Sequence, residues 1–198
     1  MIPKRIFDLV FSLAGLIILS PLFLLVTILI KRDSAGPVFF RQTRVGRGGE
    51  PFRIHKFRTM TTDSSAHSLR LTVGSDPRIT RTGRWLRRYK LDELPQLIDV
   101  VRGKMSLVGP RPEVPEYVKC YSRDQKDIVL SVRPGITDNA SIEYRDENDI
   151  LAESDNPEQD YIEKILPIKL GYYLRYVSER SMTGDIAIIL RTISAIFR

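Results

Sequence analysis

Residues 86–112 read LRRYKLDELPQLIDVVRGKMSLVGPRP, and they place two adjacent carboxylates, Asp92 and Glu93, just ahead of a proline. Pro95 is tolerated in the first turn of a helix but costs roughly 3 kcal/mol in a helix interior. A helix that carries residues 96–101 is therefore expected to start near Asp92. Both carboxylates would then lie at its amino end, where free backbone N–H groups favour anions.

Basic residues flank this pair of carboxylates on both sides. Because the amino end of a helix also suits a phosphate, the pattern indicates divalent-metal and phosphoryl chemistry, which needs charge neutralisation and a positioned nucleophile. The residues alone leave a second interpretation open, in which Asp92 caps the helix and Glu93 is solvated. The flanking cations are Arg87, Arg88, Lys90, Arg102, Lys104 and Arg111.

Three runs, DELPQL at residues 92–97, MSLVGPRPE at 105–113 and RPGIT at 133–137, resemble the monotopic phosphoglycosyl transferases, a family of bacterial sugar transferases. The likeness extends from the apolar N-terminal segment to about Thr137. It implies an enzyme that moves a sugar 1-phosphate from a UDP-sugar to polyprenyl (undecaprenyl) phosphate, the first membrane step of glycoconjugate and polysaccharide assembly. It also implies a location on the cytoplasmic face of the bacterial inner membrane.

The resemblance implies roles for single residues as well. Asp92 would attack the β-phosphorus and form a covalent aspartyl-phosphosugar, while Glu93 would hold Mg²⁺, the expected cofactor. Adjacent helical residues point about 100° apart, so one can attack while its neighbour holds the metal. The side chains expected to bind phosphate oxygens are Lys56 and Arg58 of KFRTM, Arg111 of GPRP and Arg133 of RPGIT. Without the resemblance, Lys56 and Arg58 would equally fit a solvated strand face.

The chain departs from the common family pattern at three places. Asp99 stands where an asparagine is common and Lys104 where an acid is common. Both lie outside the carboxylate pair, so we expect the chemistry to be unchanged. The third departure begins at Asp138, where the family usually continues with Gly-Trp. Residues 138–163 hold ten acids and one base, and this segment is interpreted either as a solvated face or as a contact to the sugar.

Residues 6–30 form an apolar run that is long enough to span a bilayer. Ser20 and Pro21 fall near its middle, and a Ser-Pro pair inside a helix is a kink site. Each arm is too short to span alone, and basic pairs flank both ends. We therefore expect residues 1–33 to form a re-entrant helix–break–helix and residues 34–198 a cytoplasmic catalytic domain lying on the membrane. A straight crossing and a buried core helix are the alternatives.

Further elements complete a predicted α+β fold that is mainly helical and monotopic. Residues 46–49 are read as a hairpin turn between two strands, because no Lys-Ser/Thr pair follows and no helix starts there. The basic segment 84–91 and the apolar segment 182–197 are expected to form amphipathic interfacial helices, although ordinary core packing suits them too. Other helices are expected at residues 66–71, 113–129 and 161–177, the last interrupted at Pro167.

Composition excludes several classes of protein. Cys120 is the single cysteine, and only two histidines accompany it, so neither a disulfide framework nor a zinc cluster is expected. The net charge of +7 is unevenly spread: residues 1–112 hold 20 Lys and Arg against 8 Asp and Glu, and residues 113–198 hold 11 against 16. An anionic partner is therefore expected at the basic part, and no nucleic-acid-binding motif is present.

The expected partners are a UDP-sugar, polyprenyl phosphate and inner-membrane lipid, with no nucleic acid and with homo-oligomerisation left open. Two other functions fit the same residues. One is a membrane-bound Mg²⁺-dependent phosphohydrolase that uses water as its acceptor. The other is a non-enzymatic basic scaffold that binds anionic membranes and that would tolerate the loss of Asp92.

Overall fold

The computed structural model describes residues 2–61, 76–145 and 147–196, and these form a mainly helical α+β fold, as predicted. The helices are α1 (Ile2–Ile18), α2 (Ser20–Asp33), α3 (Arg81–Arg88), α4 (Gln96–Val101), α5 (Pro115–Lys119), α6 (Arg123–Val129), α7 (Asn139–Glu143), α8 (Glu147–Ala152), α9 (Pro157–Asp160), α10 (Leu166–Glu179) and α11 (Met182–Ile196). The strands are β1 (Phe39–Val45), β2 (Pro51–Phe57), β3 (Ser106–Val108) and β4 (Gly135–Thr137). The helix expected at residues 66–71 lies outside the described residues.

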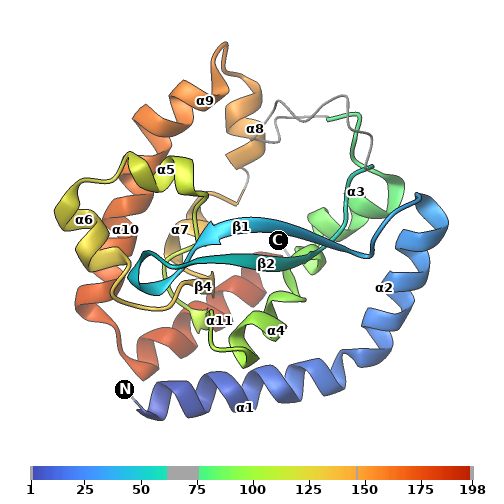
Figure 1. Ribbon diagram of the computed structural model, residues 1–198, viewed down its shortest axis with the longest axis horizontal. Coiled ribbons are helices and arrows are strands. Elements are labelled where there is room, and N and C mark those ends of the chain that lie inside the picture. Colours follow the sequence, from blue (N-terminus) through green and yellow to red (C-terminus); the bar gives the residue numbers. More distant parts are fainter. Residues whose placement is uncertain (1, 62–75, 146, 197–198) are drawn as a thin grey trace.

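The predicted hairpin is confirmed, and it crosses the middle of the molecule (Figure 1). β1 and β2 pair antiparallel, with Phe39 opposite Phe57 and Val45 opposite Pro51. Gly48 and Gly49 have φ angles of 70° and 81° in the turn, a backbone region that glycine adopts at little cost. In Figure 1, α1 runs beneath the hairpin, α2 and α3 lie at its right-hand end, and α5, α6 and α10 lie at the left.

A second, parallel pair of strands brings the GPRP and RPGIT loops together. β3 pairs with β4, the Gly109 N–H donates to the Thr137 carbonyl at 3.1 Å, and the Gly135 N–H donates to the Pro110 carbonyl at 2.9 Å. A Cβ atom on Gly135 would lie 2.1 Å from the Gly109 nitrogen. The loops can therefore cross only where both residues are glycine.

Helices α1 and α2 meet at a bend of 59°, at the predicted Ser20-Pro21 break. Pro21 lies in the first turn of α2, and the Ser20 hydroxyl donates to the Ile17 carbonyl at 2.8 Å. This bond satisfies a backbone group that a proline leaves without its usual partner. Within the described residues no single helix is long and apolar enough to cross a bilayer, whereas this bent pair passes the same criteria of length and composition when taken together.

Helix α1 turns its polar side chains toward the protein. Asp8 and Ser12 are buried, and the Asp8 carboxylate accepts the Ser106 hydroxyl at 2.8 Å and the Leu107 N–H at 3.2 Å. The opposite face is apolar and exposed, which reverses the usual pattern of a helix on a protein in water. The exposed large apolar side chains of α1 and α2 include Ile6, Val10, Phe11, Leu13, Ile17, Ile18, Leu24, Leu25 and Ile28.

Two expected helices are divided in the structure. The single helix predicted at residues 113–129 is wrong: α5 ends at Lys119, and Ser122 starts α6 with a capping box that it forms with Gln125. Such a cap satisfies free N–H groups and so favours a new helix start. The predicted break near Pro167 is confirmed, because a π-helical turn, Tyr161–Ile165, precedes α10.

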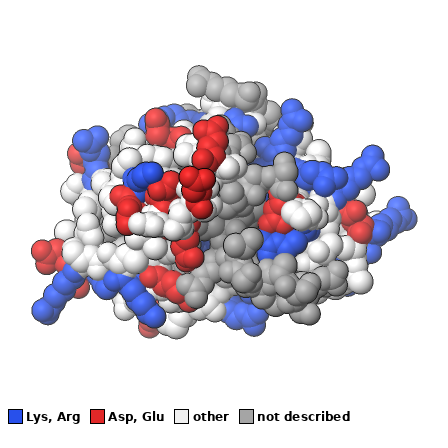
Figure 2. Space-filling model, turned by 90° about the horizontal axis from the view of Figure 1, so that it is seen from above, with Lys and Arg blue, Asp and Glu red and all other residues white. Residues whose placement is uncertain are grey.

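The molecule is charged unevenly, as the counts along the sequence indicated. Figure 2 shows the top face of Figure 1: Asp and Glu gather on its left half, and Lys and Arg project from its right-hand end. The left side is the end with α9 and α10, and the right side is the end with α2 and α3.

Candidate active site

The carboxylate pair lies in a turn of its own. Residues Leu91–Glu93 form a 3₁₀ turn, and α4 begins only at Gln96, so the prediction that the helix starts near Asp92 is wrong by one turn. Pro95 has no N–H and cannot donate to the Leu91 carbonyl, which accepts from the Leu94 N–H at 3.2 Å instead. Lys90, just before the turn, has a φ of 53°, an unfavourable value for a residue with a Cβ.

Glu93 is held between two cations from different parts of the chain. The Lys56 ammonium donates to its Oε1 at 2.8 Å, and the Arg111 guanidinium contacts both carboxylate oxygens, with Nη1 3.1 Å from Oε2. The Glu93 side chain is only 15% exposed. Burial acts to raise its pKa, but the charges and hydrogen bonds of Arg111 and Lys56 outweigh burial and hold the pKa of Glu93 well below its ordinary value.

Asp92 has a different environment from its neighbour. Among the described residues no hydrogen bond to its carboxylate is formed, whereas Glu93 accepts three. Burial raises the pKa of Asp92, Lys56 opposes this increase, and the negative charge of Glu93 adds to it. Arg87 and Lys90 also favour the ionised form. The pair therefore consists of one fixed carboxylate and one that is open to a ligand.

Two of the predicted phosphate-binding residues make other contacts. Arg58 lies just past β2, and its guanidinium donates to the carbonyls of Ala35 and, at 2.7 Å, Ser34, beyond the end of α2. Arg133 donates through Nε to the Gly103 carbonyl at 2.8 Å, at the far end of α4. The structure thus brings Lys56 and Arg111 to the carboxylate pair, but it does not bring Arg58 and Arg133 into contact with them.

A buried polar cluster lies behind the site, and the sequence patterns did not predict it. Glu113 is buried, accepts the Tyr161 hydroxyl at 2.9 Å, and lies 3.8 Å from both Arg44 and Lys169. Arg44 also donates to the Pro112 carbonyl at 3.0 Å. These contacts fix the loop that carries Arg111 between β1 and α10. The glutamate after GPRP was visible in the sequence, but nothing local identified its distant partners.

Arg87 is a further residue close to the pair. Its Nε donates to the Thr59 hydroxyl at 2.9 Å, and its charge favours the ionised form of Asp92. Gly83, one turn earlier in α3, allows this approach, because a Cβ there would lie 2.1 Å from the Thr59 carbonyl oxygen. Arg87 was one of the flanking cations in the sequence, although the family motifs had not singled it out.

The family model described as "Bacterial sugar transferase" matches residues 1–198. The chain belongs to the bacterial sugar transferase family.

Three relatives are similar over nearly the whole chain. The UDP-N-acetylgalactosamine-undecaprenyl-phosphate N-acetylgalactosaminephosphotransferase of Aeromonas hydrophila is 35% identical over 98% of this chain and 43% of its own length. The UDP-glucose:undecaprenyl-phosphate glucose-1-phosphate transferase of Escherichia coli (strain K12) is 37% identical over 96% of this chain and 39% of its own length. The exopolysaccharide production protein ExoY of Sinorhizobium fredii is 35% identical over 98% of this chain and 85% of its own length. The chain thus spans less than half the length of the first two.

In this member of the family, the carboxylate pair can be compared with the ligands that a divalent cation needs. Mg²⁺ usually binds through one or two carboxylates and completes its shell with water and substrate phosphates. No group of three or more His, Cys, Asp or Glu side chains with metal-site geometry occurs in the described part of the chain. A carboxylate offers about four acceptor positions, and Glu93 uses three, two of them on Oε1. The free position on Oε2 and the unbonded Asp92 carboxylate are therefore oxygen donors of the kind that Mg²⁺ binds.

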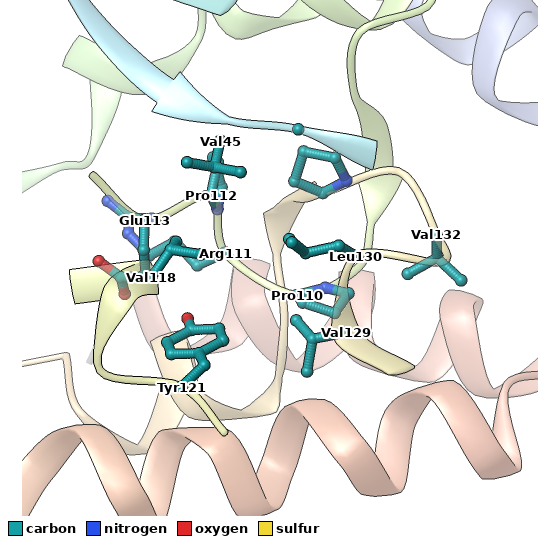
Figure 3. A pocket seen from close by; sticks show the side chains of 12 residues that line it. Val45, Pro110, Arg111, Pro112, Glu113, Val118, Tyr121, Val129, Leu130 and Val132 are labelled. Carbon is teal, nitrogen blue, oxygen red and sulfur yellow. The ribbon is translucent and has the colours of Figure 1, made fainter. Parts of the chain in front are cut away.

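A small cavity beside Arg111 is too small for a substrate. It has a volume of about 10 Å³, which is room for about one water molecule. Figure 3 shows that its walls are mostly apolar and come from the end of β1, the GPRP loop, α5 and α6. A ligand as large as a sugar nucleotide therefore cannot bind inside this cavity.

Proposed function

We propose that this chain transfers a sugar 1-phosphate from a UDP-sugar to polyprenyl phosphate, with undecaprenyl phosphate as the acceptor. The observation that carries the proposal is that the two carboxylates of the pair have different surroundings. Glu93 is fixed by Lys56 and Arg111, whereas the half-buried Asp92 carboxylate has no hydrogen bond among the described residues. The family membership and the names of the relatives support the same reaction.

Asp92 is the nucleophile of this reaction. One carboxylate oxygen forms a bond to the β-phosphorus, the bond from that phosphorus to the bridging oxygen breaks, and UMP leaves with the bridging oxygen. A phosphate oxygen of polyprenyl phosphate then attacks the aspartyl-phosphosugar. This second step releases the Asp92 carboxylate and forms the polyprenyl-diphosphate sugar. The covalent step divides one difficult transfer into two easier ones.

The cations beside Asp92 bind the charge that develops on the phosphate oxygens. Lys56 and Arg111 are already positioned by Glu93, so little reorganisation is needed when the diphosphate enters. Arg87 approaches Asp92 from α3, held by its bond to Thr59. Mg²⁺ bound by Glu93, with Asp92 beside it, would neutralise the diphosphate.

The decisive experiment separates transfer from hydrolysis. The purified chain is incubated with UDP-glucose, UDP-N-acetylgalactosamine and other UDP-sugars, with and without undecaprenyl phosphate, and UMP and the lipid product are measured. A transferase forms a lipid-linked product and needs the acceptor for repeated turnover. Free sugar phosphate formed catalytically without lipid would identify a phosphohydrolase instead. If no UDP-sugar yields UMP, both enzyme functions are refuted.

We also propose that residues 1–33 enter the membrane and return to the cytoplasmic face of the bacterial inner membrane. At 1.5 Å per residue, α1 and α2 are about 26 Å and 21 Å long, each less than a hydrocarbon core of about 30 Å. Their outer faces are apolar and the bend is 59°. Lys4 and Arg5 begin α1, and Lys31 and Arg32 end α2, as expected when both ends face the cytoplasm.

Two other helices support this membrane orientation. Trp85 and Tyr89 are exposed at the end of α3 beside its arginines, and Ile186, Leu190 and Ile193 form an exposed stripe on α11. Such surfaces suit the interface of a bilayer. In a Cys120→Ser background, single cysteines at Ile2 and Ser34 should both stay unlabelled by an impermeant thiol reagent until the membrane is opened. Labelling of Ile2→Cys alone in intact cells would show that the segment crosses.

A further inference from the structure

A cleft at the tip of the hairpin lies apart from the carboxylate pair. It has a volume of about 330 Å³ and lies between the β1–β2 turn and the turn after α4. Three cations and one acid line it, Arg47, Lys104 and Arg133 with Glu50, which gives a net charge of +2. None of the residues that line it contacts Glu93, whose partners are Lys56 and Arg111. The cleft is therefore a second cationic site.

The guanidinium of Arg133 is positioned so that it can bind a phosphate. Its Nε is bound to the Gly103 carbonyl at 2.8 Å, which fixes the plane of the guanidinium. Within the described residues its two terminal nitrogens make no hydrogen bond, so they are available as a fork for two oxygens of one anion. Gly103 has a φ of 79°, and this turn brings its carbonyl to Arg133.

Positive charges are crowded around this guanidinium. Burial lowers the pKa of Arg133, the charges of Arg5 and Arg47 lower it further, and the charge of Asp8 opposes them in part. An arginine does not lose its proton in a protein, so the repulsion remains. A bound anion would relieve it. The acid in the lining, Glu50, is 3.5 Å from Lys104, and both side chains are more than half exposed, so this ion pair offsets little of the charge.

The end of α1 lies beside the cleft and adds an apolar surface. Arg5 donates to the carbonyls of Val100 and Val101 at 2.8 and 3.2 Å, which holds α1 against the end of α4. On either side of Arg5 in α1, Ile2 and Ile6 are 76% and 56% exposed. A cationic cleft next to an exposed apolar helix end matches the chemistry of a phospholipid.

We propose that this cleft binds the phosphate of an anionic phospholipid headgroup, whose acyl chains extend along the exposed end of α1. The net positive lining favours an anionic headgroup over a zwitterionic one. A nucleotide is a poorer fit, because the aromatic ring in the lining, Phe52, is buried and offers no face for a base to stack on. This inference does not rest on sugar transfer, and it assigns to Arg133 a contact away from the carboxylate pair.

Native mass spectrometry tests the proposal directly. The full chain is released from vesicles of equal parts phosphatidylglycerol and phosphatidylcholine, and the retained lipids are identified. We expect the wild type to retain phosphatidylglycerol in preference, and Arg47→Gln/Arg133→Gln to lose that preference by about tenfold or more. Arg53→Gln is the matched control, because this exposed arginine of β2 lies outside the cleft lining. Arg47→Lys should keep most of the preference, because it preserves the charge and leaves the Arg133 fork intact, and this separates charge from folding.

Three outcomes would refute the proposal. Equal retention of phosphatidylglycerol by wild type and the double glutamine variant overturns the proposal, as does an equal loss in Arg53→Gln. A second arm titrates the detergent-solubilised chain with inorganic phosphate. If phosphate binds with the same dependence on Arg47 and Arg133 while the lipids show no preference, the cleft serves a soluble phosphate and the lipid assignment is refuted.

Discussion

Replacing Glu93 by glutamine tests whether one carboxylate holds Lys56 and Arg111 together. The amide keeps the shape of the side chain but removes the charge that both cations share. Removing one partner of a buried ion pair costs about 3–5 kcal/mol. The three side chains are 15%, 17% and 26% exposed, so solvent screening reduces the expected loss of unfolding free energy to roughly 2–3 kcal/mol. For a chain of this length that lowers Tm by about 4–12 °C.

The assay is thermal unfolding of the detergent-solubilised chain, with Glu153→Gln as the control because Glu153 is exposed after α8. The two cations hold the folded-state pKa of Glu93 below its unfolded value of about 4.3. Its contribution to stability is therefore complete at neutral pH and is lost as the pH falls through the folded-state pKa. If Glu93→Gln melts within about 1 °C of the control at pH 7, or if the difference grows on acidification, the reasoning is refuted.

Three further predictions follow from named contacts. Asp92→Asn should lower UMP release by orders of magnitude. It should not lower Tm, because burial already raises the pKa of Asp92 and so disfavours its charged form. Wild type given a UDP-sugar without lipid should show a sugar-phosphate adduct by intact mass. EDTA should stop UMP release, Mg²⁺ should restore it, and Glu93→Gln should need more Mg²⁺; an unchanged rate in EDTA would contradict the metal assignment. Gly135→Ala should lower the free energy of unfolding by several kcal/mol, because its Cβ would lie 2.1 Å from the Gly109 nitrogen. Gly171→Ala is the control: no atom lies within 4 Å of the added Cβ, so it should stabilise α10 by about 0.5–1 kcal/mol.

Features that depend on neighbouring residues could be predicted from the sequence. The turn at residues 46–49 and the break at Ser20 and Pro21 follow from glycine and proline chemistry alone, and the structure has both. The helix start near Asp92 was misplaced for a local reason as well: Pro95 lies just before the first residue of α4, not within its first turn. Long-range partners had no such signal. Nothing around Arg58 indicated that it would bind the end of α2.

The position of Arg111 shows why the site could not be assembled from its motifs alone. Arg111 and Glu93 are 18 residues apart in the chain, and their contact depends on three restraints, each of which involves a partner outside DELPQL and MSLVGPRPE. The crossing of Gly109 and Gly135 fixes the start of the GPRP loop, and Arg44 and the buried cluster around Glu113 fix its end. The last of these restraints reaches Tyr161 and Lys169, in the part of the chain with an acidic balance. That part therefore helps to position the proposed phosphate-binding residue Arg111, because it determines where the guanidinium can lie.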